Sequence, residues 1–97
     1  MVAYWIARAK INEPISYKKY MDVAGNIVET YGGHFLTRGG SYEIMEGTDH
    51  FDRFVIAEFP TIEDAKRCFN STEYKNAASN RRNGSGDVDI VFEAAFL

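Results

Sequence analysis

Hydrophobic and polar residues alternate along four stretches of the chain, and this pattern predicts four β-strands. The stretches are residues 1–9, 34–38 with a continuation at 42–47, 53–59 and 88–96. All are rich in the β-branched and aromatic residues that are enriched in strands. Gly39 and Gly40 interrupt the second stretch. Because an internal glycine often marks a bulge or bend, we expect one long bent strand over residues 34–47.

Two other stretches repeat apolar residues every three or four positions, which is the period of an amphipathic helix. The first begins with Asn12-Glu13-Pro14, which provides capping side chains and a proline for the first turn, and it ends at Gly32. The second begins with a capping box at residues 61–64 and is expected to break and restart near Asn70. It continues to Arg81.

The predicted order is strand, helix, strand, strand, helix, strand, which is the ferredoxin-like β-α-β-β-α-β arrangement. We expect a single α+β domain over residues 1–97, with a four-stranded antiparallel sheet and both helices on one face. Alternation then places an apolar set on the other face: Tyr4, Ile6, Leu36, Phe54, Ile56 and Phe92. Such a patch indicates a partner, so we expect a homodimer whose two sheets face each other around a cavity.

Charge and cysteine content restrict the partners and the compartment. The formal net charge of −3 argues against a general attraction to nucleic acid or to anionic lipid. Cys68 is the only cysteine, and no apolar stretch reaches membrane-spanning length. We therefore expect a cytoplasmic protein that has no internal disulfide and does not contact a membrane.

Several short pieces follow one another along nearly the whole chain: Tyr4, Tyr17, Tyr20, Tyr31-Gly32-Gly33, Leu36 to Gly40, Glu46-Gly47, Glu58-Phe59-Pro60, Ala65, Ser71 to Tyr74 and Arg81. In this order they resemble the family called domain of unknown function 1330, in the dimeric α+β barrel superfamily. Cys68-Phe69 departs from the resemblance, because the family commonly shows a tryptophan–tyrosine-like pair there. The resemblance implies a ferredoxin-like dimer and no established activity. Oxygenase or isomerase chemistry is an analogy at the level of the fold.

Arg38 and Glu58 are the first candidates for chemistry, because alternation places both charges on the face without helices. In one interpretation Arg38 binds a carboxylate or enolate oxygen of a small ligand, and Glu58 acts as a base or hydrogen-bond acceptor. In the other, the two residues form an ion pair that fixes strand register or the dimer interface. The second interpretation is favoured, because paired charges are common at interfaces and no third catalytic group is evident.

Further residues are candidates for catalysis or for a ligand site. His34 is a catalytic candidate, because it lies four residues from Arg38 and could share the same face, and the alternative is an ordinary surface or interface histidine. Tyr4, Phe54 and Tyr74 are large side chains that could line a cavity. Tyr74 and Arg81 lie seven residues apart on one helix face, where they could form the rim of that cavity.

No constellation of residues predicts a metal or a cofactor. Metal sites need three or four converging donors, and neither His34 nor His50 has such a set at helix or hairpin spacing. Some members of the superfamily degrade haem and use a set of Asn, Trp and His residues. This chain does not have that set in corresponding places, so haem is not predicted.

RNA binding is not expected either. Arg53–Phe59 superficially resembles a strand of RNA-recognition domains, but Ile56 occupies the place of a stacking aromatic.

The sequence thus predicts a homodimer whose cavity binds a small anionic or aromatic molecule with Arg38 as its anchor. Whether any reaction is catalysed is left open. The alternative is a non-catalytic structural or regulatory dimer, in which the same charges only lock the interface.

Overall fold

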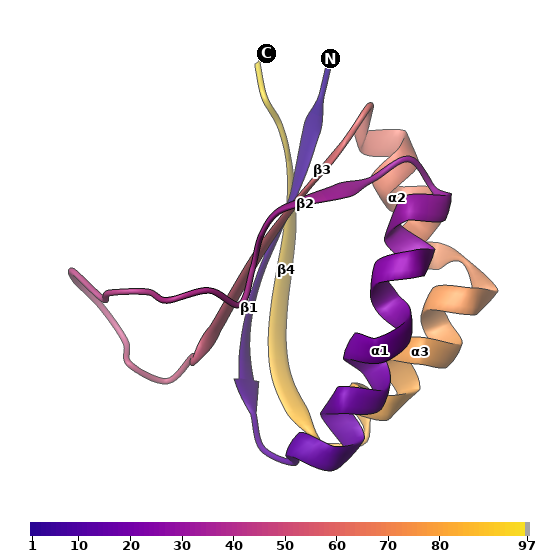
Figure 1. The fold of residues 1–97 in the computed structure, drawn as a ribbon. Helices are drawn as coiled ribbons and strands as arrows, with labels where there is room; N and C mark the ends of the chain where they lie inside the picture. Colours follow the sequence, from indigo (N-terminus) through magenta and orange to yellow (C-terminus); the bar gives the residue numbers. More distant parts are fainter. Residues whose placement is uncertain (97) are drawn as a thin grey trace.

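The computed structural model describes residues 1–96 and contains a four-stranded antiparallel sheet with three helices on one face (Figure 1). In chain order the elements are β1 (Ala3–Ile11), α1 (Pro14–Thr30), β2 (His34–Arg38), β3 (Arg53–Phe59), α2 (Ile62–Asn70), α3 (Thr72–Arg82) and β4 (Gly86–Ala94). The strands lie in the order β2-β3-β1-β4. The ferredoxin-like α+β arrangement is confirmed, with the second helix divided into α2 and α3.

Polar side chains cap α1 and α2 where the sequence predicted that these helices begin, and α3 one residue after the predicted start at Asn70. The side chain of Glu13 accepts a hydrogen bond from the Ile15 amide at 3.3 Å, directly before Pro14 opens α1. Thr61 caps α2 through the Asp64 amide at 3.1 Å. The break between α2 and α3 lies at Ser71, whose hydroxyl caps the new helix.

An aromatic core centred on Trp5 joins the sheet to the helices. The Trp5 ring lies between 5.1 and 5.9 Å, centre to centre, from the rings of Phe59, Phe69, Tyr74 and Phe92. Aromatic pairs at these distances contribute packing energy beyond their buried area. This core therefore fixes the helix layer on the face of the sheet to which Trp5 points.

The expected long bent strand over residues 34–47 does not form. β2 ends at Arg38, and residues 39–52 form a β2–β3 loop that projects from the sheet on the side away from the helices (Figure 1). Gly39 begins this loop with a φ of 71°, and its amide makes a last bond to the Phe54 carbonyl at 2.9 Å. A positive φ takes the chain out of the extended conformation, so the strand ends here. Glycine adopts this left-handed conformation readily because it has no Cβ.

The bulge lies at Leu36, before the glycine pair rather than at it. Phe35 pairs with Ala57, whereas Thr37 pairs with Ile56, so Leu36 is an extra residue in β2. An extra residue reverses the alternation of side chains beyond it. Arg38 therefore lies opposite Val55 on the helix-covered face, and its predicted place on the uncovered face is wrong.

Phe92 was also assigned to the wrong face. It lies opposite Trp5 and packs against the core on the helix-covered face. Its neighbour Val91 lies opposite Ile6 on the uncovered face and is 59% exposed. Because Val91 and Phe92 are both apolar, the pattern of the last strand fits either phase.

Candidate functional site

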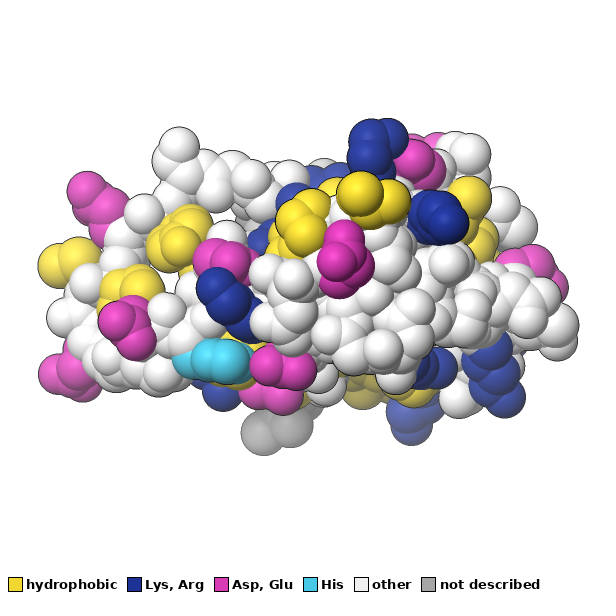
Figure 2. Space-filling model, turned by 90° about the horizontal axis from the view of Figure 1, so that it is seen from below, with side chains coloured by type: hydrophobic (Ala, Val, Ile, Leu, Met, Phe, Trp, Pro, Cys, Tyr) yellow, Lys and Arg dark blue, Asp and Glu magenta, His cyan; other side chains and the backbone are white. Residues whose placement is uncertain are grey.

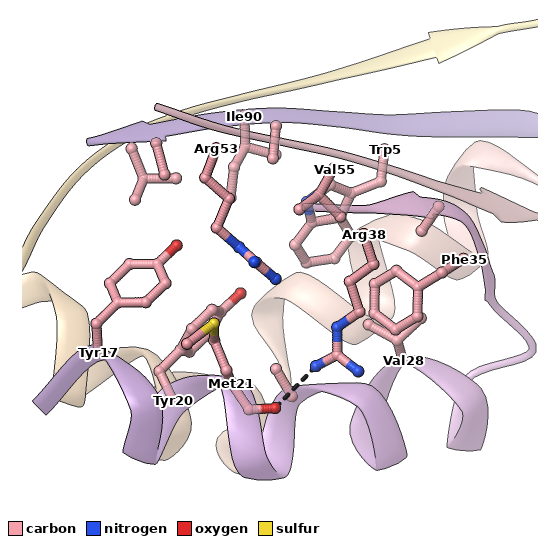
Figure 3. A pocket seen from close by; sticks show the side chains of 15 residues that line it. Trp5, Tyr17, Tyr20, Met21, Val28, Phe35, Arg38, Arg53, Val55 and Ile90 are labelled. Carbon is pink, nitrogen blue, oxygen red and sulfur yellow. Dashed lines mark hydrogen bonds between the residues drawn. The ribbon is translucent and has the colours of Figure 1, made fainter. Parts of the chain in front are cut away.

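A narrow cavity lies between α1 and the helix-covered face of the sheet (Figure 3). The volume that the centre of a water molecule can occupy inside it is about 40 Å³. Most of its lining is apolar and comes from α1 and all four strands: Trp5, Ala7, Ala9, Met21, Ala24, Val28, Phe35, Val55, Ala57, Val88 and Ile90. Its polar side chains are Tyr17, Tyr20, Arg38 and Arg53. The cavity is thus an apolar space with a few hydrogen-bond donors, which is typical of small-molecule sites.

Arg38 reaches from the end of β2 across to α1. Its Nη2 donates a hydrogen bond to the Met21 carbonyl oxygen at 2.8 Å, and its guanidinium lies 4.4 Å from the centre of the Phe35 ring (Figure 3). A Cβ added to Gly25 would lie 2.8 Å from Nη1 of Arg38. Gly25 therefore leaves the space on α1 over which the arginine lies.

Arg53 opens β3 in phase with the buried residues Ala57 and Phe59, so its side chain enters the cavity. Figure 3 shows its guanidinium pointing toward Tyr20. Among residues 1–96, neither Arg38 nor Arg53 forms an ion pair with a carboxylate. Two positive charges therefore face a mostly apolar space and are available to an anion.

A chain of hydrogen bonds lies behind the cavity wall. The hydroxyls of Tyr20 and Tyr74 are 2.8 Å apart, and Nη2 of Arg81 donates to the Tyr74 hydroxyl at 3.0 Å. Tyr74 is fully buried and Arg81 nearly so, which contradicts their predicted place at a cavity rim. Burial raises the pKa of Tyr74 and, more weakly, the pKa of Tyr17. The phenols of Tyr74 and Tyr17 are therefore neutral near pH 7.

The other predicted site residues lie on the uncovered face. Glu58 is opposite Tyr4 on one side and opposite His34 on the other, with 3.9 Å between His34 Nε2 and Glu58 Oε2. Phe54 packs against Tyr42 of the β2–β3 loop, with ring centres 4.9 Å apart. The expected pairing of Arg38 with Glu58 is therefore wrong, because the two residues lie on opposite faces. So is the expected placement of His34 on the face of Arg38.

The uncovered face is a shallow apolar depression with paired charges at its side. Ile6, Phe54, Ile56 and Val91 line it. Nε of Arg8 lies 3.1 Å from the carboxylate of Asp89. Figure 2, which views the molecule from below, shows hydrophobic and acidic side chains together on the projecting loop at the left. The exposed apolar residues of that loop include Tyr42, Ile44 and Met45.

Metal and thiol chemistry find no support in the described part of the chain. Over residues 1–96 no group of three or more His, Cys, Asp and Glu side chains is arranged to hold a metal ion. Burial raises the pKa of the Cys68 thiol to about 12, so the thiolate that would act as nucleophile is scarce at neutral pH. Within the same residues, no helix is both long and apolar enough to span a bilayer.

The sequence interpretation missed the polar side chains that define the cavity together with Arg38: Tyr17, Tyr20 and Arg53. The signal for Arg53 is its parity, which is that of Ala57 and Phe59. Gly25 stands in the middle of a helix, where glycine is unfavourable unless space is needed, and this signal points to Arg38. No local signal separates Tyr17 and Tyr20 from ordinary core residues.

Solved structures with the same fold include proteins with and without an assigned activity. A protein of unknown function from Rhodopseudomonas palustris has a TM-score of 0.79 at 16% identity, covering 99% of this chain and 83% of that one. A cofactor-independent oxygenase from Streptomyces nogalater has a TM-score of 0.67 at 11% identity, with coverages of 99% and 94%. A protein from Nitrosomonas europaea, proposed to be an antibiotic biosynthesis monooxygenase, has a TM-score of 0.65 at 13% identity, with coverages of 98% and 90%.

At these identities the likeness shows the fold alone. No curated protein matches the sequence significantly. Residues 2–94 match the family described as Domain of unknown function (DUF1330). The chain therefore belongs to this family, and it shares the ferredoxin-like α+β fold of these solved structures.

Proposed function

We propose that this protein binds a small molecule with an anionic oxygen and an apolar or aromatic body in the cavity between α1 and the sheet. Arg38 and Arg53 are its anchors. The observation that carries the proposal is that both guanidinium groups reach an apolar cavity without an ion-pair partner among residues 1–96. Arg38 is exposed and Arg53 is half-buried, so a ligand can reach both guanidinium groups from solvent, and their geometry matches that of a carboxylate.

The size of the cavity limits what enters without movement. One water needs about 10–15 Å³ of such space, so 40 Å³ holds roughly three waters. A carboxylate group fits directly, whereas a six-membered ring needs a change in a flexible wall residue. Met21 and Arg53 are long, unbranched side chains that line the cavity and can make this change.

The lining supports binding more directly than it supports turnover. It contains no histidine, aspartate or glutamate that could act as a general base within the described residues. An enolate or phenolate ligand that enters already ionised would be held by the same donors. Chemistry of the oxygenase or isomerase type would therefore rely on a ligand that loses its proton readily.

We also propose that a second copy of the chain covers the uncovered face. Ile6 and Val91 are exposed at its centre, and Arg8 and Asp89 place both signs of charge beside them. A two-fold interface brings one patch against itself, so a patch that carries both signs can complement its own copy. The alternative to ligand binding is a purely structural or regulatory dimer. The uncovered face, considered without the cavity, favours this alternative.

A thermal-stability panel tests the ligand proposal. Benzoate at ten times its dissociation constant is expected to stabilise the folded protein by about 1.4 kcal/mol, or roughly 6–11 °C for a chain of this size. Benzyl alcohol has the same ring without the charge and should give a much smaller shift. Arg38→Gln and Arg53→Gln should each reduce the benzoate shift.

The matched control is Arg67→Gln. Arg67 is an exposed arginine on α2 that pairs with Asp64 and does not line the cavity. It should leave the benzoate shift unchanged. A flat response of the wild-type protein to benzoate and other small aromatic and aliphatic carboxylates would contradict the proposal and favour the structural dimer.

A further inference from the structure

We infer that Tyr20 presents its hydroxyl proton to the cavity as a hydrogen-bond donor, and that Tyr74 and Arg81 position it for this role. The inference rests on the proposed ligand site, because it concerns what that site recognises. It adds a specificity-determining residue on α1, and it extends the site to two buried residues on α3 that do not line the cavity.

The direction of the hydrogen-bond chain begins at Arg81. A guanidinium has only N–H donors and no acceptor. Its Nη2 therefore donates to the Tyr74 hydroxyl, 3.0 Å away, and Tyr74 accepts through its oxygen. Arg81 is 5% exposed, and its guanidinium lies 5.1 Å from the centre of the Tyr20 ring, so the residue is held by both tyrosines.

The Tyr74 hydroxyl has one proton to donate and one acceptor within reach. Its side chain is 0% exposed, and within residues 1–96 its hydroxyl has hydrogen-bond contacts with Arg81 and with Tyr20 only. Arg81 cannot accept a proton, whereas the Tyr20 oxygen lies 2.8 Å away. If Tyr20 donated instead, the buried Tyr74 hydroxyl would have no acceptor, which native structures avoid. Tyr74 therefore donates to Tyr20.

Because Tyr20 accepts from Tyr74, its own proton is free for the cavity that it lines. Arg53 points toward Tyr20 from the opposite wall and offers only donors (Figure 3). Arg38 is a donor at the same cavity. The oxygen of a ligand placed among these groups must accept every hydrogen bond, which selects a carboxylate, enolate or phenolate oxygen over an amine.

The chain also strengthens the donor. Hydrogen bonds in series polarise one another, and the positive charge of Arg81 stands at the start of this series. Arg81 forms no ion pair among residues 1–96, and its Nε has no hydrogen-bond partner there. Its charge is therefore not neutralised locally and acts through Tyr74 on the proton of Tyr20.

Three single-atom deletions separate this role from simple packing. In calorimetric titrations with benzoate, Tyr20→Phe should weaken binding about tenfold, because a hydrogen bond to a charged group is lost. Tyr74→Phe should weaken it by a smaller factor, because Tyr20 loses its donor and can turn its proton away from the ligand. Tyr31→Phe is the matched control, because the Tyr31 hydroxyl donates to Glu73 at 2.7 Å and the residue does not line the cavity, so this variant should leave the affinity unchanged.

Equal effects of Tyr20→Phe and Tyr31→Phe would overturn the inference, and so would wild-type binding of benzylamine as tight as that of benzoate. A neutron crystal structure tests the direction without any ligand. We expect the deuterium between the two oxygens on Tyr74, and a deuterium on Tyr20 that points at Tyr74 would overturn the inference. If wild-type protein binds none of the carboxylates, the proposed function fails, while the neutron structure still decides the direction.

Discussion

Arg8 and Arg53 lie on opposite faces of the same sheet, and their surroundings differ in one respect that separates two kinds of site. On the uncovered face, Arg8 is paired with Asp89 at 3.1 Å, and Glu58 lies 3.9 Å from His34. On the helix-covered face, Arg53 lines a cavity and has no carboxylate partner among residues 1–96. Paired charges beside apolar residues suit an interface between proteins, whereas unpaired charges in a cavity suit a small anion.

Neighbouring residues of β1 give the largest expected difference between the faces. Trp5 points into the aromatic core, and Tyr4 points to the uncovered face. Trp5→Ala should lower the free energy of unfolding by about 3–5 kcal/mol, because it removes a buried aromatic and leaves a cavity. Tyr4→Ala should cost less than half as much in denaturant unfolding at low protein concentration. Similar losses in the free energy of unfolding for both variants would mean that the uncovered face contributes as much to the stability of the monomer as the aromatic core does.

A charge at the centre of the uncovered face should weaken self-association. Ile6→Glu buries an unpaired carboxylate if two sheets meet there, so the dissociation constant of the dimer should rise at least about tenfold in sedimentation experiments. Ile15→Glu, at an exposed position of α1, is the matched control and should leave association unchanged. Wild-type protein that sediments only as a monomer at micromolar concentration would contradict the dimer.

The buried thiol of Cys68, on the helix-covered side, makes the stability of the fold decrease at alkaline pH. Burial raises the pKa of its thiol from 9.0 to about 12 in the folded chain. Between these values the unfolded thiol loses its proton while the folded one keeps it, so stability falls as pH rises from about 9 to 12. The slope from this group is at most about 1.4 kcal/mol per pH unit.

Cys68→Ala removes this contribution and should make the decline between pH 9 and pH 11 shallower in denaturant titrations. The buried tyrosines titrate in the same direction and remain in the variant, which leaves a residual slope. An unchanged slope in Cys68→Ala would show that the thiol is not protected by burial.

Gly25→Ala should separate stability from binding. Alanine in the middle of α1 stabilises the helix by about 0.5–1 kcal/mol relative to glycine. The new Cβ would lie 2.8 Å from Nη1 of Arg38, so the end of that flexible side chain must move. We expect a small rise in the unfolding midpoint together with weaker benzoate binding. A rise in both the unfolding midpoint and the affinity for benzoate would show that the position of Arg38 over α1 does not matter for the ligand.

The fold could be predicted from the sequence because each long element carries its own period and its own boundary residues. Pro14 and Thr61 begin helices where the pattern places them, and the break before α3 lies at Ser71, one residue beyond the predicted start signal at Asn70. These signals act over a few residues and do not depend on the rest of the chain.

The faces of side chains could not all be predicted, because one extra residue changes the phase of a strand. The glycine pair suggested a bulge at residues 39–40, but the bulge is at Leu36, so Arg38 was placed on the wrong face. Val91 and Phe92 are both apolar and leave the phase of β4 open. Tyr74 and Arg81 do share a helix face, yet their burial depends on how α3 packs against α1, which no local pattern specifies.

Side-chain NMR of the arginines during a benzoate titration tests the central claim most directly, because it locates the anion on one face of the sheet. We predict that the Nε–Hε resonances of Arg38 and Arg53 shift together and saturate at one affinity, while those of Arg8 and Arg67 stay in place. Shifts at Arg8, with Arg38 and Arg53 unmoved, would contradict the claim and place the ligand on the uncovered face.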